Sequence, residues 1–451
     1  MQLSENGKKA RNTVLNMLND TFEKGMFIRT VEEKYISSGE FDRRDTAFIR
    51  RMYIGVIERS IFIDKCIDQV SNVSVTKMKP VILNILRMGI YQLFFMDNVP
   101  DHAAIGESAR LAGYRGFARL VPFVNGVLRS VQREGYEKLC SYMTEYEILS
   151  VPKWIWDMVC IQYGKENAKE FFNEALESDT RLTVCLNRRK MDPEAIIEAL
   201  GKEGCDLVWA DEGSNSFYMT FKGALTSLEG FKKGLFWVQD ISSVRAALAG
   251  CKAIYKEISK GVLCGSNTRE KAIQDNADLL IVDVCASPGG KSICAAEYFP
   301  ASQIISRDIS QAKVELINEN AKRLGLCNIK AQVHDALVYD ESLNEKADLV
   351  IADLPCSGLG VIRHKPDIKL RLKENDLQSL SKLQRDILSV VYQYVKKGGI
   401  MLYSTCTVNK DENIQNAKWC AARYGFEILE QEQVLTGGRD GFYICVMKRT
   451  R

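Results

Sequence analysis

Two cysteines follow strand-like segments in the C-terminal half of this 451-residue chain. Cys356 lies in ADLPCSG (352–358), and Cys406 lies in YSTCTVNKDEN (403–413). A single cysteine is most often a small core residue, but two cysteines at adjacent strand ends point to chemistry. A thiol has an ordinary pKa of roughly 8.5, so modest electrostatic help produces a nucleophilic thiolate. The pattern therefore predicts covalent catalysis that involves these two sulfur atoms.

Acidic side chains end three successive strand-like segments of the same region, at Asp308, Asp335 and Asp353. Because ligands of an open parallel sheet bind at the carboxyl ends of its strands, we expect these side chains at one edge. Asp308 follows Asp283 at close to the roughly 20-residue spacing of acids that bind ribose hydroxyls. Asp335, after the next strand, is placed to reach an adenine amino group. The acids predict a nucleoside ligand.

The segment VDVCASPGGKS (282–292) ends like a phosphate-binding loop. A P-loop, however, has the pattern G-x-x-x-x-G-K-[ST], and Cys285 stands where its first glycine is required. Carboxylates repel phosphate but accept hydrogen bonds from ribose hydroxyls, which favours adenosine without phosphates. S-adenosylmethionine fits, because its positive sulfonium suits an acidic pocket. The alternative is a P-loop-like NTPase with Asp353 as its magnesium ligand.

A nucleophilic thiol beside a methyl donor has a specific use in pyrimidine chemistry. Carbon 5 of cytosine is a poor nucleophile until a thiolate adds to carbon 6 and turns the ring into an enamine. A second base must then remove the carbon 5 proton before the thiolate leaves. The two cysteines beside the expected cofactor therefore predict methylation of cytosine at carbon 5.

A parallel sheet must hold these residues together. From about Gly234 onward, strand-like runs alternate with helical runs, which predicts a doubly wound α/β domain. The first part of the chain instead has apolar residues at three- and four-residue steps, as an all-α domain does. We expect an all-α domain over 1–140, a helical connector over 141–178, a small α/β module over 179–235 and the catalytic domain over 236–451.

The composition is that of an ordinary globular protein, with 46% hydrophobic residues and a net charge of +3. The polar N-terminus has no apolar signal-peptide core, and no stretch approaches the roughly 18 apolar residues of a membrane span. The cysteines are scattered singly without a C-x-x-C pair, which argues against zinc ribbons and disulfide scaffolds. We expect a cytoplasmic protein with reduced thiols, no metal and no membrane association.

Several motifs resemble those of the RNA 5-methylcytosine methyltransferases of the Nol1/Nop2/Sun group. They are CASPGGK (285–291), DLPCSG (353–358), STCT (404–407), FWVQD (236–240) and RDGFYICVMKR (439–449). Three N-terminal segments resemble the NusB-like RNA-binding domain: DRRDTAFIRRMYIGVI (42–57), PDHAAIGESARLA (100–112) and FVNGVLRSVQRE (123–134). The resemblance extends over nearly the whole chain.

The resemblance implies a NusB-like domain, a small RRM-like module and a Rossmann-like S-adenosylmethionine-dependent methyltransferase domain. It makes Cys406 the nucleophile toward carbon 6, and Cys356 the base for deprotonation or release. Asp353 would touch the cofactor and the cytosine. The cofactor would be held by Asp308, Asp335 and the loop residues Cys285, Ala286, Ser287, Pro288, Gly289, Gly290 and Lys291. The implied partner is 16S ribosomal RNA, and the implied state is a monomer.

Some alternatives stay open at this stage. The substrate could be another ribosomal RNA site or a tRNA, or the chain could be an inactive RNA-binding assembly factor. The basic segment GVIRHKPDIKLR (360–371) could bind RNA phosphates or could be an ordinary solvated loop.

Overall fold

The computed structural model describes residues 5–36, 39, 41–177, 181–259, 278–437 and 439–451. Two compact units are present, each with its own hydrophobic core. The first comprises Met1–Glu177 and Ile362–Arg371, and the second comprises Ser178–Val361 and Leu372–Arg451. We describe them separately.

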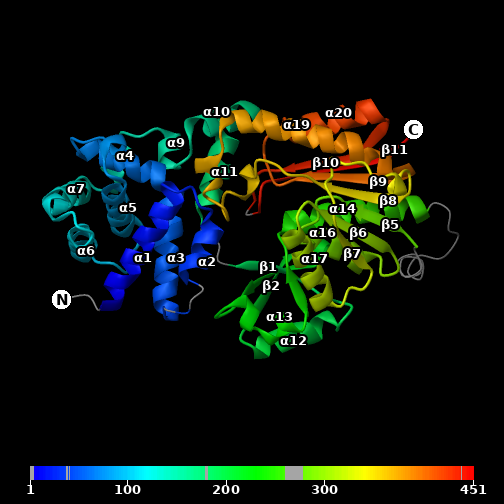
Figure 1. The fold of residues 1–451 in the computed structure, drawn as a ribbon, viewed down its shortest axis with the longest axis horizontal. Helices are drawn as coiled ribbons and strands as arrows, with labels where there is room; N and C mark the ends of the chain where they lie inside the picture. The colour runs from blue at the N-terminus through cyan, green and yellow to red at the C-terminus, as the bar shows by residue number, and fades with distance from the viewer. Residues whose placement is uncertain (1–4, 37–38, 40, 178–180, 260–277, 438) are drawn as a thin grey trace. The chain divides into compact units, whose positions relative to one another are not determined.

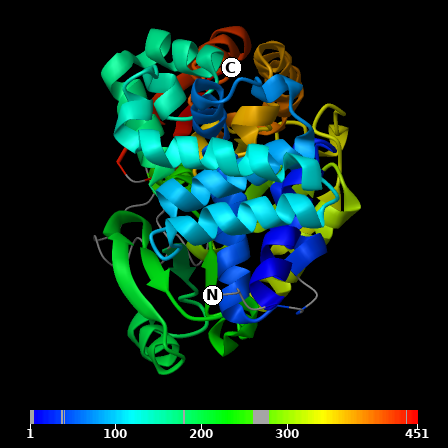
Figure 2. The ribbon, with the colours of Figure 1, turned by 90° about the vertical axis from the view of Figure 1, so that its left-hand side faces the viewer.

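The first unit is helical in its described residues, as the sequence predicts (Figures 1 and 2). Its core is formed by apolar side chains spaced at three and four residues, such as Ile82, Ile85 and Leu86, which are buried against neighbouring helices. Its main helices are α1 (Glu5–Phe22), α2 (Ile28–Ile36), α3 (Arg43–Glu58), α4 (Ser60–Val70), α5 (Pro80–Phe95), α6 (Asp101–Tyr114), α7 (Val121–Glu134), α10 (Lys153–Tyr163) and α11 (Lys165–Leu176).

A short segment from the C-terminal half of the sequence, Ile362–Arg371, packs in this first unit. The Lys369 ammonium is 2.7 Å from the Glu58 carbonyl oxygen, and the Arg371 guanidinium lies 3.9 Å from the centre of the Phe27 ring. Only 4% of Lys369 is exposed, and burial lowers the pKa of its amine to about 7. Part of the basic segment predicted over 360–371 is thus built into a packed unit, so the solvated-loop alternative does not describe it.

The second unit begins with a small antiparallel sheet in the region of the expected α/β module, and its last strand lies just beyond the expected boundary at residue 235. Its strands are β1 (Leu182–Leu186), β2 (Asp206–Asp211), β3 (Ser216–Thr220) and β4 (Phe236–Val238), in the order β2-β3-β1-β4. Helices α12 (Pro193–Lys202) and α13 (Glu229–Lys232) join them. Ile196 and Leu200 of α12 pack on Val184 and Phe217 in the core of this module.

The larger sheet has seven strands in the order β10-β11-β9-β8-β5-β6-β7. Five of them, β5 (Leu280–Asp283), β6 (Gln303–Asp308), β7 (Ile329–Val333), β8 (Ala347–Asp353) and β9 (Val395–Thr405), are parallel and correspond to the predicted strands. The chain reverses its direction of travel between β7 and β8, which places β5 at the switch point where such sheets bind ligands.

Helices cover both faces of this sheet (Figure 1). One face packs on α14 (Ile241–Ser259), α16 (Gly290–Tyr298) and α17 (Gln311–Leu324), and the other packs on α19 (Glu374–Val391) and α20 (Ile414–Tyr424). Adjacent strand residues face opposite layers, so Leu349 joins the first core and Val350 joins the second. The central strands β5 and β8 are therefore buried on both sides, which explains their nearly continuous apolar sequences.

The sheet is mixed, whereas the sequence predicts a parallel one. Strands β10 (Phe426–Val434) and β11 (Phe442–Arg449) form a hairpin, and β11 pairs antiparallel with β9. The connection from β10 to β11 has no crossover helix, and a short connection of this kind allows only antiparallel pairing. The doubly wound Rossmann-like fold is confirmed. Strands β10 and β11 are not among the five predicted strands, and their antiparallel pairing makes the sheet mixed rather than wholly parallel.

Three further observations concern the described residues alone. No helix there combines the length and the apolar character needed to cross a membrane. Every cysteine in this part of the chain is a free thiol. No group of three or more histidine, cysteine or acidic side chains in it is arranged to hold a metal ion.

A close backbone approach at Gly360 predicts a strong effect of substitution. The Gly360 amide donates to the Cys406 carbonyl at 3.0 Å, and a Cβ atom here would lie 1.7 Å from the Gly441 carbonyl oxygen. Because the neighbour is backbone, Gly360→Ala should destabilise the protein by about 1–3 kcal/mol. Gly201→Ala is the control, since nothing lies within 4 Å of a Cβ atom at that exposed helical position. Differential scanning calorimetry should show a lower Tm for Gly360→Ala only; equal Tm values for both variants would contradict the close approach.

Candidate active site

The loop between β5 and α16 owes its shape to two glycines. Gly289 has φ +105°, a conformation that side chains rarely adopt, and it precedes the first residue of α16. At Gly290 an added Cβ would lie only 2.8 Å from the Gln239 side chain, which follows β4. The Ala286 amide donates to the Arg307 carbonyl of β6 at 2.8 Å, which ties the loop to the neighbouring strand. The two glycines thus allow a tight turn and close packing.

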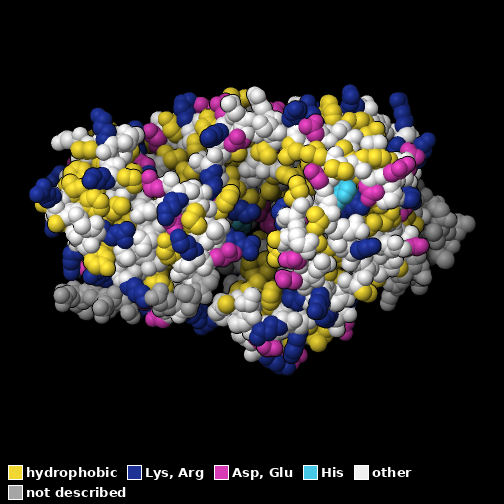
Figure 3. All heavy atoms as spheres, in the orientation of Figure 1, with side chains coloured by type: hydrophobic (Ala, Val, Ile, Leu, Met, Phe, Trp, Pro, Cys, Tyr) yellow, Lys and Arg dark blue, Asp and Glu magenta, His cyan; other side chains and the backbone are white. Residues whose placement is uncertain are grey.

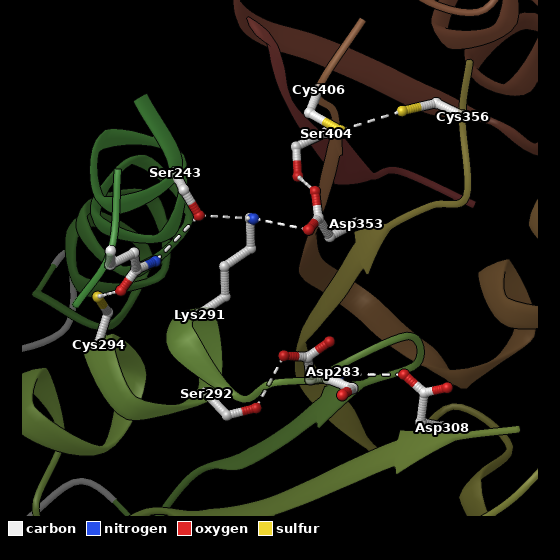
Figure 4. A network of polar contacts seen from close by, with 12 residues as sticks. Ser243, Asp283, Lys291, Ser292, Cys294, Asp308, Asp353, Cys356, Ser404 and Cys406 are labelled. Atoms are coloured by element: carbon white, nitrogen blue, oxygen red, sulfur yellow. Dashed lines mark hydrogen bonds and ion pairs between the residues drawn. The ribbon is translucent and has the colours of Figure 1, made fainter. Parts of the chain in front are cut away.

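Lys291 does not project into an open phosphate-binding loop. Its side chain is 7% exposed, and its ammonium lies 2.7 Å from Asp353 Oδ2 and 2.9 Å from Ser243 Oγ (Figure 4). The ammonium also lies 5.1 Å from the centre of the Phe442 ring. The lysine and the aspartate that would bind phosphate and magnesium in the P-loop reading are therefore paired with each other.

The Asp353 carboxylate is held through both of its oxygens. Lys291 binds Oδ2, and the Ser404 hydroxyl donates to Oδ1 at 2.7 Å (Figure 4). Asp353 of β8 and Ser404 of β9 are direct partners in the parallel ladder, so the register of the two strands creates this contact. The Asp353 side chain keeps 33% of its surface exposed, which leaves it accessible to a ligand.

The two cysteines predicted to act together lie side by side. Their sulfur atoms are 3.4 Å apart, because β8 and β9 are neighbouring parallel strands and each cysteine follows its strand by a few residues (Figure 4). The hydrogen bond with Cys406, followed by burial, raises the pKa of the Cys356 thiol well above its usual value. Once deprotonated, a thiolate of raised pKa is a strong proton acceptor.

The other acids occupy different positions at the same sheet edge. Asp308, at the end of β6, accepts from the Ser287 amide at 3.0 Å and from the Ile309 amide at 2.8 Å. Asp335 lies in the connection after β7, where its carboxylate accepts from the Leu337 amide at 2.9 Å. Asp308 is thus tied directly to the loop over 285–291, whereas Asp335 is held by its own turn.

Burial raises the pKa of two ionisable groups at the loop. Asp283 accepts from the Ser292 hydroxyl at 2.7 Å, and burial raises the pKa of its carboxyl to about 7. Burial also raises the pKa of the Cys285 thiol, which favours the neutral form. Cys285 is therefore a poor third nucleophile, although it belongs to the loop.

A cavity of about 410 Å³ opens beside the loop. Its walls include loop residues from Cys285 to Pro288, and Lys291 and Asp353 also line it. It is large enough for a small ligand. Asp308, Asp335, Cys356 and Cys406 are not among its lining residues, so the predicted site residues are distributed around the loop rather than gathered in one cavity.

The structure reveals site residues that the sequence interpretation missed. Ser243 of α14 binds Lys291, Ser404 of β9 binds Asp353, and Gln239 packs on Gly290. Serine and glutamine are common surface residues, and their contacts depend on helices and strands distant in sequence. The only signal was their position: Gln239 and Ser404 lie inside motifs, FWVQD and STCT, that carry the family resemblance.

The residues fit S-adenosylmethionine as a ligand of this sheet edge. At Gly289 and Gly290 the loop backbone packs closely against side chains of Ile317 and Gln239, and Asp308 lies at the end of the neighbouring strand β6, where its carboxylate binds the loop. Carboxylates accept hydrogen bonds from ribose hydroxyls and favour a cationic methionine end. The Asp283 Oδ1 atom, buried below the loop, has no hydrogen-bond partner among the described residues.

Comparison with known sequences gives two family matches. Residues 271–424 match the family "16S rRNA methyltransferase RsmB/F", and residues 8–133 match the NusB family. A Bacillus subtilis protein named "Probable ribosomal RNA small subunit methyltransferase B" is 31% identical over 440 residues, which cover 92% of this chain and 93% of that protein. The ribosomal RNA small subunit methyltransferase B of Photorhabdus laumondii is 27% identical and aligns with 99% of this chain and 100% of that one.

Solved structures show the same fold. PH0851 is 20% identical and matches with a TM-score of 0.74 over the whole of both chains. NSun6 from Pyrococcus horikoshii, crystallised with SFG, is 19% identical and matches with a TM-score of 0.54 over 66% of this chain and 98% of that one. The two sequence matches and the full-length relative show that this chain belongs to the RsmB/F family of S-adenosylmethionine-dependent RNA methyltransferases, with a NusB-family domain at its N-terminal end.

Proposed function

We propose that this protein transfers a methyl group from S-adenosylmethionine to carbon 5 of a cytosine in 16S ribosomal RNA. The observation that carries the proposal is the pair of sulfur atoms, 3.4 Å apart, at the sheet edge that also holds Asp353. The names of the full-length relatives support small-subunit ribosomal RNA as the substrate. A different ribosomal RNA site or a tRNA is the alternative substrate.

In this mechanism the Cys406 thiolate forms a bond to carbon 6 of the cytosine. This bond displaces an electron pair to carbon 5 and makes that carbon nucleophilic, and bound S-adenosylmethionine would supply the electrophilic methyl group for it and leave as S-adenosylhomocysteine. Cys356 first loses its thiol proton to solvent and then, as a thiolate, takes the carbon 5 proton. The electron pair of the carbon 5–hydrogen bond re-forms the 5,6 double bond and expels the Cys406 thiolate from carbon 6, which releases 5-methylcytosine. The short distance between the sulfurs supports this division, because carbons 5 and 6 are neighbours in the ring.

Asp353 is proposed to orient the cytosine. Its two oxygens are fixed by Lys291 and Ser404, so a lone pair is held in place to accept from the cytosine amino group. We assign the loop from Cys285 to Lys291, with Asp308 and Asp335, to S-adenosylmethionine, which supplies the electrophilic methyl group. Within the loop, Lys291 acts through Asp353, because its ammonium is already committed to that carboxylate.

RNA binding is assigned in part to the domain proposed over 1–140. A groove of about 920 Å³ on the first unit includes Arg11, Arg44 and Arg51 in its lining, together with Asp42 and Asp45. On the face drawn in Figure 3, Lys and Arg side chains lie among acidic and hydrophobic ones, in agreement with the small net charge. We propose that the connector over 141–178 and the module over 179–235 link this domain to the catalytic domain over 236–451 in a monomer.

Replacement of the nucleophile is the first test. Cys406→Ser should lower methyl transfer to unmodified 16S RNA on the order of 1,000-fold or more, the scale of losing a catalytic nucleophile. Transfer of radiolabelled methyl groups measures it, with Cys327→Ser as the control because that cysteine is exposed and distant in sequence from the motifs. Bisulfite sequencing of the RNA product, with tRNA as a competing substrate, identifies the base; normal turnover by Cys406→Ser would refute the assignment.

Removal of the second sulfur should have the opposite signature. Cys356→Ala should still attack the cytosine but fail to resolve the covalent intermediate, so a denaturant-resistant protein–RNA band should accumulate on a gel. The double variant Cys356→Ala/Cys406→Ser is the matched control and should give no band. A Cys356→Ala protein that turns over without such a band would show that this cysteine has another role.

Cofactor binding depends on Asp308 in this proposal. Asp308→Ala removes a charged hydrogen-bond acceptor and should weaken S-adenosylhomocysteine binding by roughly 10- to 100-fold. Isothermal titration calorimetry measures the Kd, and Glu319→Gln, an exposed change on α17, should leave it unaltered. Magnesium–ATP in the same experiment tests the P-loop alternative: tight binding of ATP and none of S-adenosylhomocysteine would overturn the cofactor assignment.

A further inference from the structure

Two consecutive buried residues, Glu412 and Asn413, connect to the two cysteine loops. They lie between β9 and α20, and neither has measurable exposed surface. Their side chains contact different segments: Glu412 binds the loop that contains Cys356, and Asn413 binds the residues on either side of Cys406. Neither residue was singled out by the sequence analysis, and the proposed mechanism does not use them.

The Cys356 loop is held on both sides of the cysteine. Glu412 accepts from the Ser357 amide at 2.8 Å and from the Ser357 hydroxyl at 2.6 Å. The Gln384 amide of α19 donates to the Pro355 carbonyl at 2.9 Å and to the Glu412 carboxylate at 3.2 Å. The backbone groups immediately before and after Cys356 therefore bind to one pair of touching side chains.

Gln384 is itself immobilised within the core. Its carbonyl oxygen accepts from the Asn416 amide at 2.8 Å and from the Tyr403 hydroxyl at 3.2 Å, and it is fully buried. The Glu412 carboxylate receives a further bond from the Asn409 amide at 3.1 Å. Buried polar groups of this kind fix a single geometry only when their partners are complete.

Cys406 is held in the same way by Asn413. The Thr405 hydroxyl donates to Asn413 Oδ1 at 2.5 Å, and Asn413 Nδ2 donates to the Thr407 carbonyl at 2.9 Å. Asn413 Nδ2 also donates to Gln433 of β10 at 2.7 Å, so a second strand anchors it. The residues that flank Cys406 are thus joined through one side chain.

The two arrangements meet at the Thr407 hydroxyl. It lies 2.7 Å from the Ser357 hydroxyl, and it accepts at 3.2 Å from the backbone amide of Asn409, whose side chain binds Glu412. Burial raises the pKa of the Glu412 carboxyl, and the bonds from Ser357 act against that rise. Burying a carboxylate costs free energy, which the neighbouring donors recover only in part. A misplacement of a reacting group by about 1 Å can lower the rate roughly 100-fold. Fixed positions of the two cysteines can therefore offset the free energy lost by burying the carboxylate.

We infer that Glu412 and Asn413 are positioning residues with separate tasks, Glu412 holding Cys356 for proton removal and release and Asn413 holding Cys406 for attack. The division into two steps rests on the proposed cytosine-C5 mechanism. The separation of the contacts does not rest on it, because each side chain binds the neighbours of only one cysteine.

Single-turnover reactions of the full-length protein with radiolabelled 16S RNA test the inference. Glu412→Ala should resolve the covalent adduct about 10- to 100-fold more slowly, so the denaturant-resistant band should increase above that of the unaltered protein. The rate of adduct resolution in Glu412→Gln should lie between those of Glu412→Ala and the unaltered protein, because the amide oxygen of the glutamine can still accept from the Ser357 amide. Asn413→Ala should slow adduct formation by a similar factor and leave no increased band. In the double variant Cys356→Ala/Asn413→Ala, the trapped band should appear more slowly than in Cys356→Ala.

A purely structural effect has a different signature. Loss of folded protein lowers both the adduct and the product, so an increased adduct in Glu412→Ala is not a consequence of instability. Thermal unfolding and S-adenosylhomocysteine binding report the folded fraction, and Gln415→Ala, an exposed change on α20, is the matched control. Parallel losses of adduct and product in both variants, in proportion to the unfolded fraction, would overturn the inference.

Alkylation separates this inference from the proposed function. Iodoacetamide labelling of each thiol, followed by mass spectrometry, should show altered reactivity of Cys356 in Glu412→Ala and of Cys406 in Asn413→Ala, with the other thiol unchanged. If Cys356→Ala fails to trap an adduct, the proposed role of Cys356 as the base is refuted. The labelling result alone then tests whether Glu412 and Asn413 position the two cysteines. If Cys356→Ala traps the adduct and Glu412→Ala changes neither band nor labelling, only the positioning role of Glu412 falls.

Discussion

The parallel pairing of β8 with β9 determines where Asp353 and the two cysteines lie. Their register sets Asp353 opposite Ser404, and the two connections that leave these strands place the Cys356 and Cys406 sulfurs 3.4 Å apart. Both strands are buried on two faces, so a shift of register would move apolar side chains out of the two cores. The packing of the sheet therefore fixes the positions of Asp353 and of the two sulfur atoms.

Several charged side chains surround the paired strands, and they differ in how deeply they are buried. Lys291 lies beneath the sheet edge and binds Asp353, and Asp283 lies deeper, where burial raises the pKa of its carboxyl to about 7. Glu412 lies behind the cysteine loop with four hydrogen-bond donors around its carboxylate. Each buried acid is thus held by named donors, and the partly exposed Asp353 remains available to a ligand.

The polar residues next to the two cysteines are buried because they hydrogen-bond to the loops that carry these cysteines. Hydroxyl and amide side chains such as Ser357, Thr407 and Asn413 would be expected on a surface, yet all three are buried. Their hydrogen bonds join the connections after the two strands to each other, and the bond from Gln384 to the Pro355 carbonyl joins them to α19. Loops that would otherwise move acquire the rigidity of the elements beneath them.

The sequence alone determined the helical and α/β domains, the five parallel strands and the cysteine pair, because periodicity and motif spacing are local properties. It also placed Asp308, Asp335 and Asp353 at strand ends, since parallel strands share one carboxyl edge. Tertiary structure alone decided the antiparallel β11, the partner of Lys291 and the tasks of Glu412 and Asn413. Those outcomes depend on which distant segments pack together, and a serine, an asparagine or a lysine carries no local sign of the neighbour it will bind.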